Sequence, residues 1–131
     1  MKFSANVQND SDYHQVILKV GEKEQTLSIA PKPTGGSNVT GGELLFLALA
    51  TCFCNDIYCE AAKRDVKVES VEVEVEGDFE AERKPASNIV YRVKVNANAS
   101  EEKIQELIMY VDSIAEIQNT LRLGTPVTLE A

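Results

Sequence analysis

The chain has 131 residues, of which 44% are hydrophobic and 26% are charged. This balance supplies a core for one folded domain, which we predict over residues 1–131, and it excludes a fully disordered chain. The formal net charge of −8 at pH 7 would repel phosphate backbones and anionic lipid surfaces, so we expect neither a nucleic-acid nor a membrane partner.

The expected location is the cytoplasm. The first residues contain no apolar segment typical of a secretory signal, and the longest apolar run, Leu44 to Cys54, has 11 residues, too few to cross a bilayer. All three cysteines lie between Cys52 and Cys59, an odd and clustered set that suits free thiols in a reducing compartment.

The N-terminal third is predicted to be β structure. Apolar residues alternate over residues 3–7, and residues 16–20 and 26–29 form β-rich runs separated by a turn at 21–24. Pro31 and Pro33 end this sheet, and a loop with four glycines follows over residues 34–42.

A helix is predicted from Glu43 to Arg64. Thr40 can cap it, Glu43 lies in its first turn, and Lys63 and Arg64 are expected in its last turn, where the helix dipole favours cations. Its first half is apolar on nearly every side, so we expect a second chain to pack against it.

The second half predicts two strands, a helix and a short closing strand. Residues 71–76 alternate valine and glutamate, and a bulge should separate them from Val66 and Val68, which have the opposite phase. A strand over residues 90–95, an amphipathic helix that starts at Ser100 and has an apolar stripe from Ile104 to Ala115, and a strand over residues 127–129 complete an α+β domain. Gly124 ends the helical region.

The cysteines are the candidate nucleophiles. On an intact helix Cys52 and Cys54 point to opposite faces, while Cys52 and Cys59 share a face but lie roughly 10 Å apart along the axis, so neither pair forms a disulfide within one chain. Nearby ligands for a metal are missing, and we expect no metal site. Each cysteine is also explained as a small buried hydrophobe, and Glu43 as a first-turn carboxylate that satisfies the helix dipole.

Other catalytic patterns are absent from the sequence. His14, the single histidine, lies in a polar stretch and is expected at the surface rather than acting as a base. The pairs Gly35-Gly36 and Gly41-Gly42 match neither a dinucleotide-binding nor a P-loop pattern, so no nucleotide cofactor is expected.

Several segments together resemble the OsmC/Ohr family, over roughly residues 15–131. They are Gly35-Gly36-Ser37-Asn38, the run from Glu43 to Cys52, the strand over 71–77, the amphipathic second helix, and Asn119-Thr120-Leu121. The resemblance implies an intertwined α+β homodimer with antiparallel sheets around long central helices, and thiol-dependent reduction of hydroperoxides. It places Cys52 at the peroxide-reacting cysteine and Glu43 at the glutamate that, with an arginine, activates it.

Two departures from the family pattern predict a weakened reaction. Ala115 stands where the family has its resolving cysteine, and the first arginine of this chain is Arg64, although the activating arginine belongs in the N-terminal third. Without that cation only a few per cent of an ordinary thiol is ionised at neutral pH. An external dithiol would then have to recycle Cys52.

Two alternatives to peroxide chemistry stay open at this stage. One is a non-catalytic dimeric module that binds a small apolar ligand in the former peroxide pocket. The other is a structural dimer that binds no small molecule.

Overall fold

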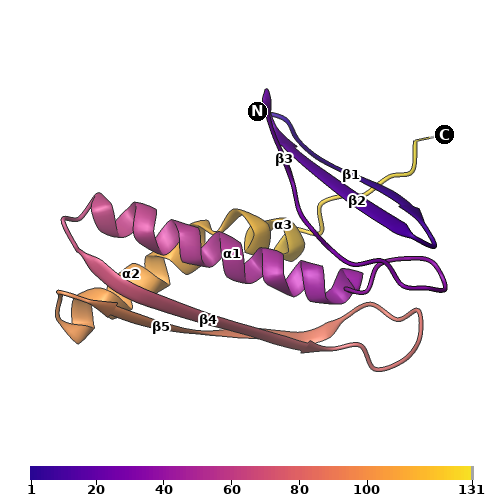
Figure 1. The fold of residues 1–131 in the computed structure, drawn as a ribbon. Helices are drawn as coiled ribbons and strands as arrows, with labels where there is room; N and C mark the ends of the chain where they lie inside the picture. Colours follow the sequence, from indigo (N-terminus) through magenta and orange to yellow (C-terminus); the bar gives the residue numbers. More distant parts are fainter. Residues whose placement is uncertain (131) are drawn as a thin grey trace. The chain divides into compact units, whose positions relative to one another are not determined.

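Eight regular elements follow one another in the computed structural model, which describes residues 1–130 (Figure 1). They are β1 (Phe3–Asp10), β2 (Tyr13–Val20), β3 (Lys23–Thr26), α1 (Gly41–Ala62), β4 (Val68–Asp78), β5 (Ser87–Ala97), α2 (Glu101–Ile114) and α3 (Glu116–Arg122). The α+β class is therefore confirmed. The chain divides into two compact units, Met1–Leu44 and the part from Leu45 onward, which are described separately.

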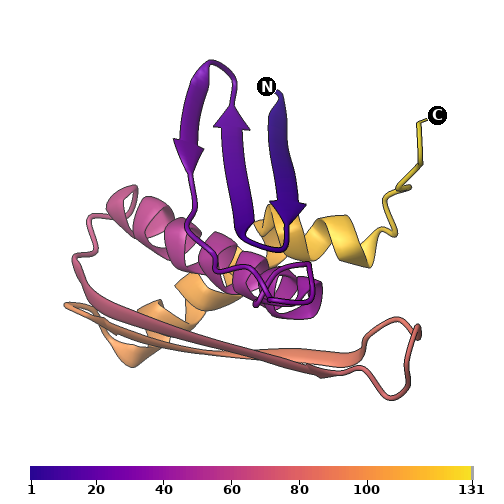
Figure 2. The ribbon, with the colours of Figure 1, turned by 45° about the vertical axis from the view of Figure 1, so that its right-hand side comes forward.

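The N-terminal unit contains one antiparallel sheet in the order β1-β2-β3 (Figure 2). Val20 pairs with Lys23, so the second turn has only two residues, and Gly21 adopts a φ of 58° in it. Tight hairpin turns need such positive φ values, which glycine adopts without strain. The predicted four-residue turn was wrong, and the third strand accordingly ends at Thr26 instead of continuing through residues 26–29.

This sheet has one apolar and one polar face. Phe3, Ala5 and Val7 pair directly with Val20, Leu18 and Val16, and directly paired residues share a face. On that face Phe3 remains 67% exposed and Val7 59% exposed. The single chain thus leaves much of an apolar sheet face uncovered.

The start of α1 is a capping box formed by Thr40 and Glu43. The Thr40 hydroxyl accepts a hydrogen bond from the Glu43 amide at 3.2 Å, and the Glu43 carboxylate accepts one from the Thr40 amide at 3.1 Å. These reciprocal bonds satisfy amide groups that a helix start leaves free. The prediction that Thr40 caps this helix is confirmed.

The end of α1 comes earlier than predicted. The helix stops at Ala62, so Lys63 and Arg64 lie just beyond it and not in its last turn. Asp65 has a left-handed φ of 54°, and the Val66 amide closes the end by bonding to the Ala61 carbonyl at 2.9 Å.

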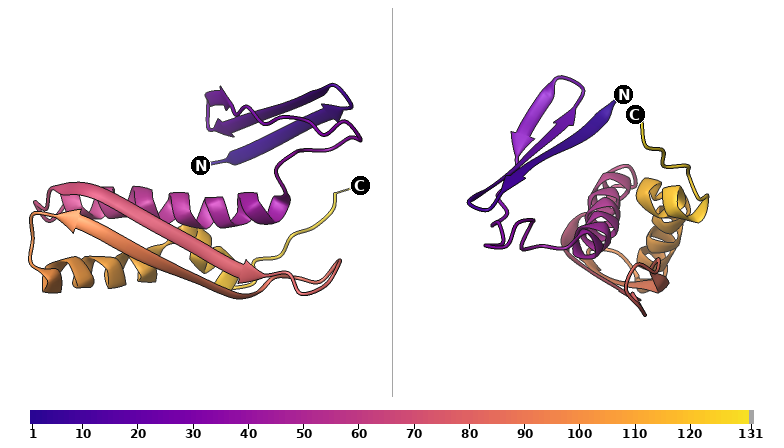
Figure 3. Two further views of the ribbon diagram at one scale, coloured as in Figure 1. Left: turned by 60° about the horizontal axis from the view of Figure 1, so that its bottom comes forward. Right: turned by 90° about the vertical axis from the view of Figure 1, so that its right-hand side faces the viewer.

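The second unit is built on the two-stranded antiparallel sheet of β4 and β5. Helices α1 and α2 both lie on one face of this sheet (Figures 1 and 3). The core between them consists of Phe53, Ile57, Ala61, Leu107, Val111 and Ala115, with the inward-facing side chains of β4 and β5 packed against it. The predicted valine alternation in residues 71–76 is confirmed, with Val71 and Val73 facing this core.

A bulge near the start of β4 is also confirmed. Val68 pairs with Ala97 and Ser70 with Asn96, so two steps on β4 match one step on β5. Farther along β4, a Cβ at Gly77 would lie 2.8 Å from the ring of Phe46, so only glycine lets the strand pass beneath that ring.

The C-terminal region differs from the sequence prediction in two ways. Helix α2 ends at Ile114, Ala115 is extended with a ψ of 112°, and a separate helix α3 follows. Residues 127–129 form no strand, and Val127 and Leu129 are 98% and 96% exposed. A strand needs a partner edge, and none of residues 1–130 pairs with this segment.

By length and apolar composition α1 is able to span a membrane, the one helix among residues 1–130 of which this is true. The 11-residue run predicted from the sequence therefore underestimated this apolar segment. The core helix of a soluble protein passes the same test, and α1 buries Leu49, Phe53 and Ile57 against the rest of its unit. This packing identifies α1 as a core helix.

Candidate functional site

The site is centred on Cys52, a half-buried thiol in the middle of α1. Its sulfur lies 3.8 Å from Oδ2 of Asp56, which follows four residues later on the same helix. Residues four apart on a helix face the same side, so the local backbone places this carboxylate beside the thiol. The S–H group donates to the carboxylate.

The N-terminal end of α3 completes the surroundings of the sulfur. The backbone amides of Glu116 and Ile117 point to Cys52 closely enough to lower the pKa of its thiol. The break between α2 and α3 at Ala115 leaves these amides free, because in a continuous helix they would donate to backbone carbonyls of the preceding turn. Ala115 therefore immediately precedes the two amides that lower the pKa of the Cys52 thiol.

The net electrostatic effect is to keep Cys52 protonated. Burial raises the pKa of the Cys52 thiol, and the charge and hydrogen bond of Asp56 raise it further, so the Ile117 and Glu116 amides lower it only in part. None of the named groups that shift this pKa is a cation.

The pKa of Asp56 is raised as well. Burial is the main cause, and the negative charges of Glu116 and Glu60 add to it, while the hydrogen bond from Cys52 and the charge of Lys63 oppose it. The Cys52 thiol and the Asp56 carboxylate therefore lie side by side on α1, and both are partly desolvated.

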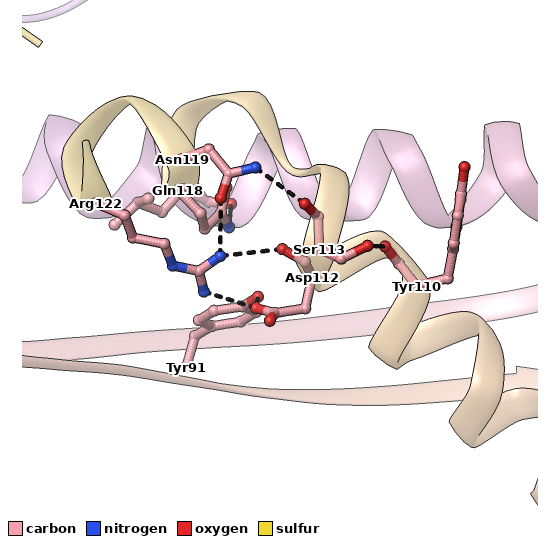
Figure 4. A network of polar contacts seen from close by, with 8 residues as sticks. Tyr91, Tyr110, Asp112, Ser113, Gln118, Asn119 and Arg122 are labelled. Carbon is pink, nitrogen blue, oxygen red and sulfur yellow. Dashed lines mark hydrogen bonds and ion pairs between the residues drawn. The ribbon is translucent and has the colours of Figure 1, made fainter.

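A polar network holds α3 in position (Figure 4). Arg122 donates to the Asp112 carboxylate at 2.8 Å and to the Asp112 carbonyl at 3.0 Å, and Tyr91 of β5 donates to the same carboxylate. Asn119 donates to the Ser113 carbonyl at 3.0 Å. Side chains of α3 thus cap the free carbonyls at the end of α2, which fixes the start of α3 against the sulfur.

Cys54, Cys59 and His14 are absent from the groups that shift the pKa of the Cys52 thiol. Cys54 is half-buried and Cys59 is exposed, and all three cysteines are free. The Asn9 side-chain amide lies 2.9 Å from Nδ1 of His14, on the N-terminal sheet.

Glu43 is held by Thr40. The Thr40 amide and hydroxyl lower the pKa of the Glu43 carboxyl, which accepts the hydroxyl hydrogen bond at 2.8 Å. Nine residues along α1 separate it from Cys52, so a helical step of about 100° per residue places the two on opposite faces.

Sequence reasoning missed Asp56 and the amides of Glu116 and Ile117. The four-residue spacing between Cys52 and Asp56 was a usable signal for the carboxylate. No local signal marks the amides, because they approach the thiol from more than sixty residues away in the chain. Within residues 1–130, no three histidine, cysteine or acidic side chains gather as a metal site would require.

Comparison with known protein families gives a match. A family profile described as OsmC-like protein matches residues 34–130. A search of curated protein sequences finds no match.

Several solved structures have the same fold. An OsmC-like protein from Mycoplasma pneumoniae is 19% identical, with a TM-score of 0.63 over 93% of this chain and 89% of that one. An OsmC-like protein of unknown function from Vibrio cholerae is 18% identical, with a TM-score of 0.61 over 92% and 93%. The organic hydroperoxide resistance protein OhrB of Bacillus subtilis is 14% identical, with a TM-score of 0.56 over 93% and 91%. At these identities the likeness shows the fold, and it confirms the predicted one.

Proposed function

The chain belongs to the OsmC-like protein family, and from this premise we propose that it reduces hydroperoxides slowly through the single thiol of Cys52. The observation that carries the proposal is the position of the sulfur, half-buried and faced by the Glu116 and Ile117 amides. Two proteins of similar fold, from Legionella pneumophila and Bacillus subtilis, are named organic hydroperoxide resistance proteins, which supports a role in peroxide stress.

The proposed reaction has two halves. The Cys52 sulfur attacks the terminal oxygen of the hydroperoxide, an S–O bond forms, the O–O bond breaks, and the thiol proton ends on the departing alcohol. Sulfur is oxidised to a sulfenic acid and the peroxide is reduced. The amides of Glu116 and Ile117 stabilise the thiolate from which this attack starts.

A dithiol from outside the chain completes the cycle. Its first sulfur displaces water from the sulfenic acid, and its second sulfur releases Cys52 as a thiol and leaves the dithiol oxidised to a disulfide. Ala115 cannot do this because it has no thiol. A reducing compartment such as the cytoplasm supplies reductants of this class.

The reaction is slow because the nucleophile is seldom ionised. Burial and Asp56 raise the pKa of Cys52, and the thiolate is the reactive form. The rate should therefore rise with pH through the neutral range.

Glu43 has a positioning role in this proposal. Its carboxylate accepts hydrogen bonds from Thr40 and anchors the start of the helix that carries Cys52. A direct role would make Glu43→Gln lose peroxide reactivity, whereas a positioning role predicts nearly unchanged reactivity, because glutamine keeps the oxygen that the capping box requires.

A homodimer is the proposed assembly. The apolar face of the N-terminal sheet, with Phe3 and Val7 exposed, and the exposed Val127 and Leu129 both leave apolar side chains uncovered in one chain. Uncovered apolar surface of this kind is typical of protein interfaces.

Mass spectrometry after titration with tert-butyl hydroperoxide tests the thiol chemistry, with dimedone present to trap sulfenic acid. One equivalent should modify Cys52 before Cys54 or Cys59, and Cys52→Ser should abolish dithiol-dependent peroxide consumption. Cys59→Ser is the matched control and should keep it. Equal or negligible modification of Cys52 would overturn the proposal.

A further inference from the structure

A carboxylate lies beside the sulfur that the proposed reaction uses. Asp56 follows Cys52 by four residues on α1, and its Oδ2 accepts a hydrogen bond from the Cys52 thiol at 3.8 Å. This bond directs the thiol proton at a carboxylate oxygen. Transfer of that proton would leave a thiolate next to a carboxylic acid.

The peroxide reaction requires a proton to move between two places. Cys52 attacks as a thiolate, so its thiol must lose a proton first. The departing oxygen of the hydroperoxide leaves as a basic alkoxide, so it must gain one. A side chain that accepts the first proton and donates it at the second place acts as general base and then as general acid.

The surroundings of Asp56 make its carboxylate a better proton acceptor than an exposed one. Burial raises the pKa of the Asp56 carboxyl, and the charges of Glu116 on α3 and Glu60 on α1 raise it further, against the opposing effects of the Cys52 hydrogen bond and the Lys63 charge. Lys63 forms its own ion pair with Glu60 at 2.8 Å. Because the pKa of the Cys52 thiol is raised as well, the transfer remains unfavourable and the thiolate scarce.

The other polar groups near the sulfur are unsuited to this transfer. The Glu116 and Ile117 amides donate hydrogen bonds, but a backbone amide keeps its proton at neutral pH. Glu43 lies on the opposite face of α1 and is held by Thr40. Among the side chains of residues 1–130, the Asp56 carboxylate is the one that hydrogen-bonds the sulfur.

We propose that Asp56 is a catalytic residue, which takes the thiol proton of Cys52 and passes it to the departing oxygen of the hydroperoxide. This role rests on the peroxide reaction proposed above and names its proton carrier. The thiol proton moves to Oδ2, sulfur bonds to the terminal oxygen, the O–O bond breaks, and the carboxylic acid protonates the alkoxide. Sulfur is oxidised to the sulfenic acid, the peroxide is reduced to an alcohol, and the carboxylate is restored.

Two reactions of the same sulfur separate proton delivery from the supply of thiolate. Iodoacetamide releases iodide, which needs no proton, whereas tert-butyl hydroperoxide releases an alkoxide, which does. Both rate constants are measured by mass spectrometry at pH 7 in the full chain carrying Cys54→Ser and Cys59→Ser, with dimedone trapping the sulfenic acid. The ratio of oxidation rate to alkylation rate should fall about tenfold or more in Asp56→Asn, since water replaces a general acid only in part.

Glu60→Gln is the matched control for charge. It removes a negative charge that acts on Asp56 and leaves the Cys52–Asp56 hydrogen bond in place. Alkylation and oxidation should then change together, so their ratio should stay nearly constant.

The wild-type pH profile gives a second readout that needs no substitution at Asp56. From about pH 8 to about pH 6, alkylation should fall with the thiolate fraction. Oxidation should fall less steeply, because the thiol and the carboxylate keep one proton between them over this range.

Four results would overturn the role of Asp56. An unchanged ratio in Asp56→Asn, an equal fall in Glu60→Gln, or identical pH profiles for the two reactions would each do so and leave the peroxide proposal standing. No oxidation of Cys52 in the wild type would overturn both proposals.

Discussion

The two units of the chain use their apolar side chains in opposite ways. In the unit from Leu45 onward, Phe53 and Ile57 are completely buried between two helices and a sheet. In the N-terminal unit, Phe3 is 67% exposed on the apolar face of its sheet. The unit from Leu45 onward builds a core from its own residues, whereas the N-terminal unit presents an apolar face that only further contacts can bury.

The largest expected effect tests the buried side of this comparison. Phe53→Ala should lower the free energy of unfolding by about 3–5 kcal/mol, because a fully buried ring is lost and a cavity remains. Its ring also packs edge-on against Tyr91 at 5.1 Å between centroids. Urea unfolding monitored by circular dichroism measures the change, and a loss below about 1 kcal/mol would mean that this core is not closed around Phe53.

Phe3→Ala tests the exposed side. In the proposed homodimer a second copy covers the sheet face, so the substitution should raise the dimer dissociation constant at least tenfold, about 1.4 kcal/mol. Sedimentation equilibrium measures this constant, with Ser4→Ala on the polar face as the matched control. A monomeric wild type, or equal effects of the two variants, would contradict the dimer proposed for this face.

Tyr91→Phe sharpens the comparison within the well-packed unit. It removes the hydroxyl that donates to Asp112 and should destabilise the protein by about 1 kcal/mol at pH 7. Hydrogen bonding from Tyr91 lowers the pKa of the Asp112 carboxyl, with Arg122 adding to the effect.

The pH dependence of this effect has a definite sign. A carboxyl with a lowered pKa stabilises the fold above its unfolded pKa of about 3.9 and loses that contribution as pH falls through its folded value. The difference between wild type and Tyr91→Phe should therefore shrink on acidification below pH 4. Thermal unfolding from pH 7 to pH 3 checks it, and a constant difference would show that Asp112 is not the partner that matters.

The smallest stability effect is expected at the start of α1, where the two units join. Thr40→Ala removes the cap and should cost about 0.5–1 kcal/mol. Glu43→Gln keeps an oxygen that can accept from the Thr40 amide and should change stability less. Differential scanning calorimetry of both variants decides this, and a larger loss for Glu43→Gln would give the charge a role beyond capping.

Local features of the fold were predictable from the sequence. The Thr40 and Glu43 spacing signals a capping box, the alternating valines give β4, and their change of phase gives its bulge. The end of α1 was misplaced because it depends on the left-handed backbone of Asp65, which no pattern marks.

The candidate site was predictable only in part. A family resemblance predicts Cys52 as the reactive thiol, and Asp56 lies at a spacing that helical periodicity reveals. The Glu116 and Ile117 amides come from the far end of the chain, and Gln118 turns toward α1 only because α3 separates from α2. Such contacts follow from tertiary packing, which a single sequence does not encode locally.

The central claim is that Cys52 is a thiol held in its protonated form by burial and Asp56. The direct test is the rate of alkylation by iodoacetamide against pH, in a Cys54→Ser, Cys59→Ser background with and without Asp56→Asn. We predict a midpoint above the ordinary cysteine range, and a lower midpoint with several-fold faster alkylation at pH 7 once Asp56 is neutral. A midpoint below neutral pH, or one that Asp56→Asn leaves in place, would contradict the account.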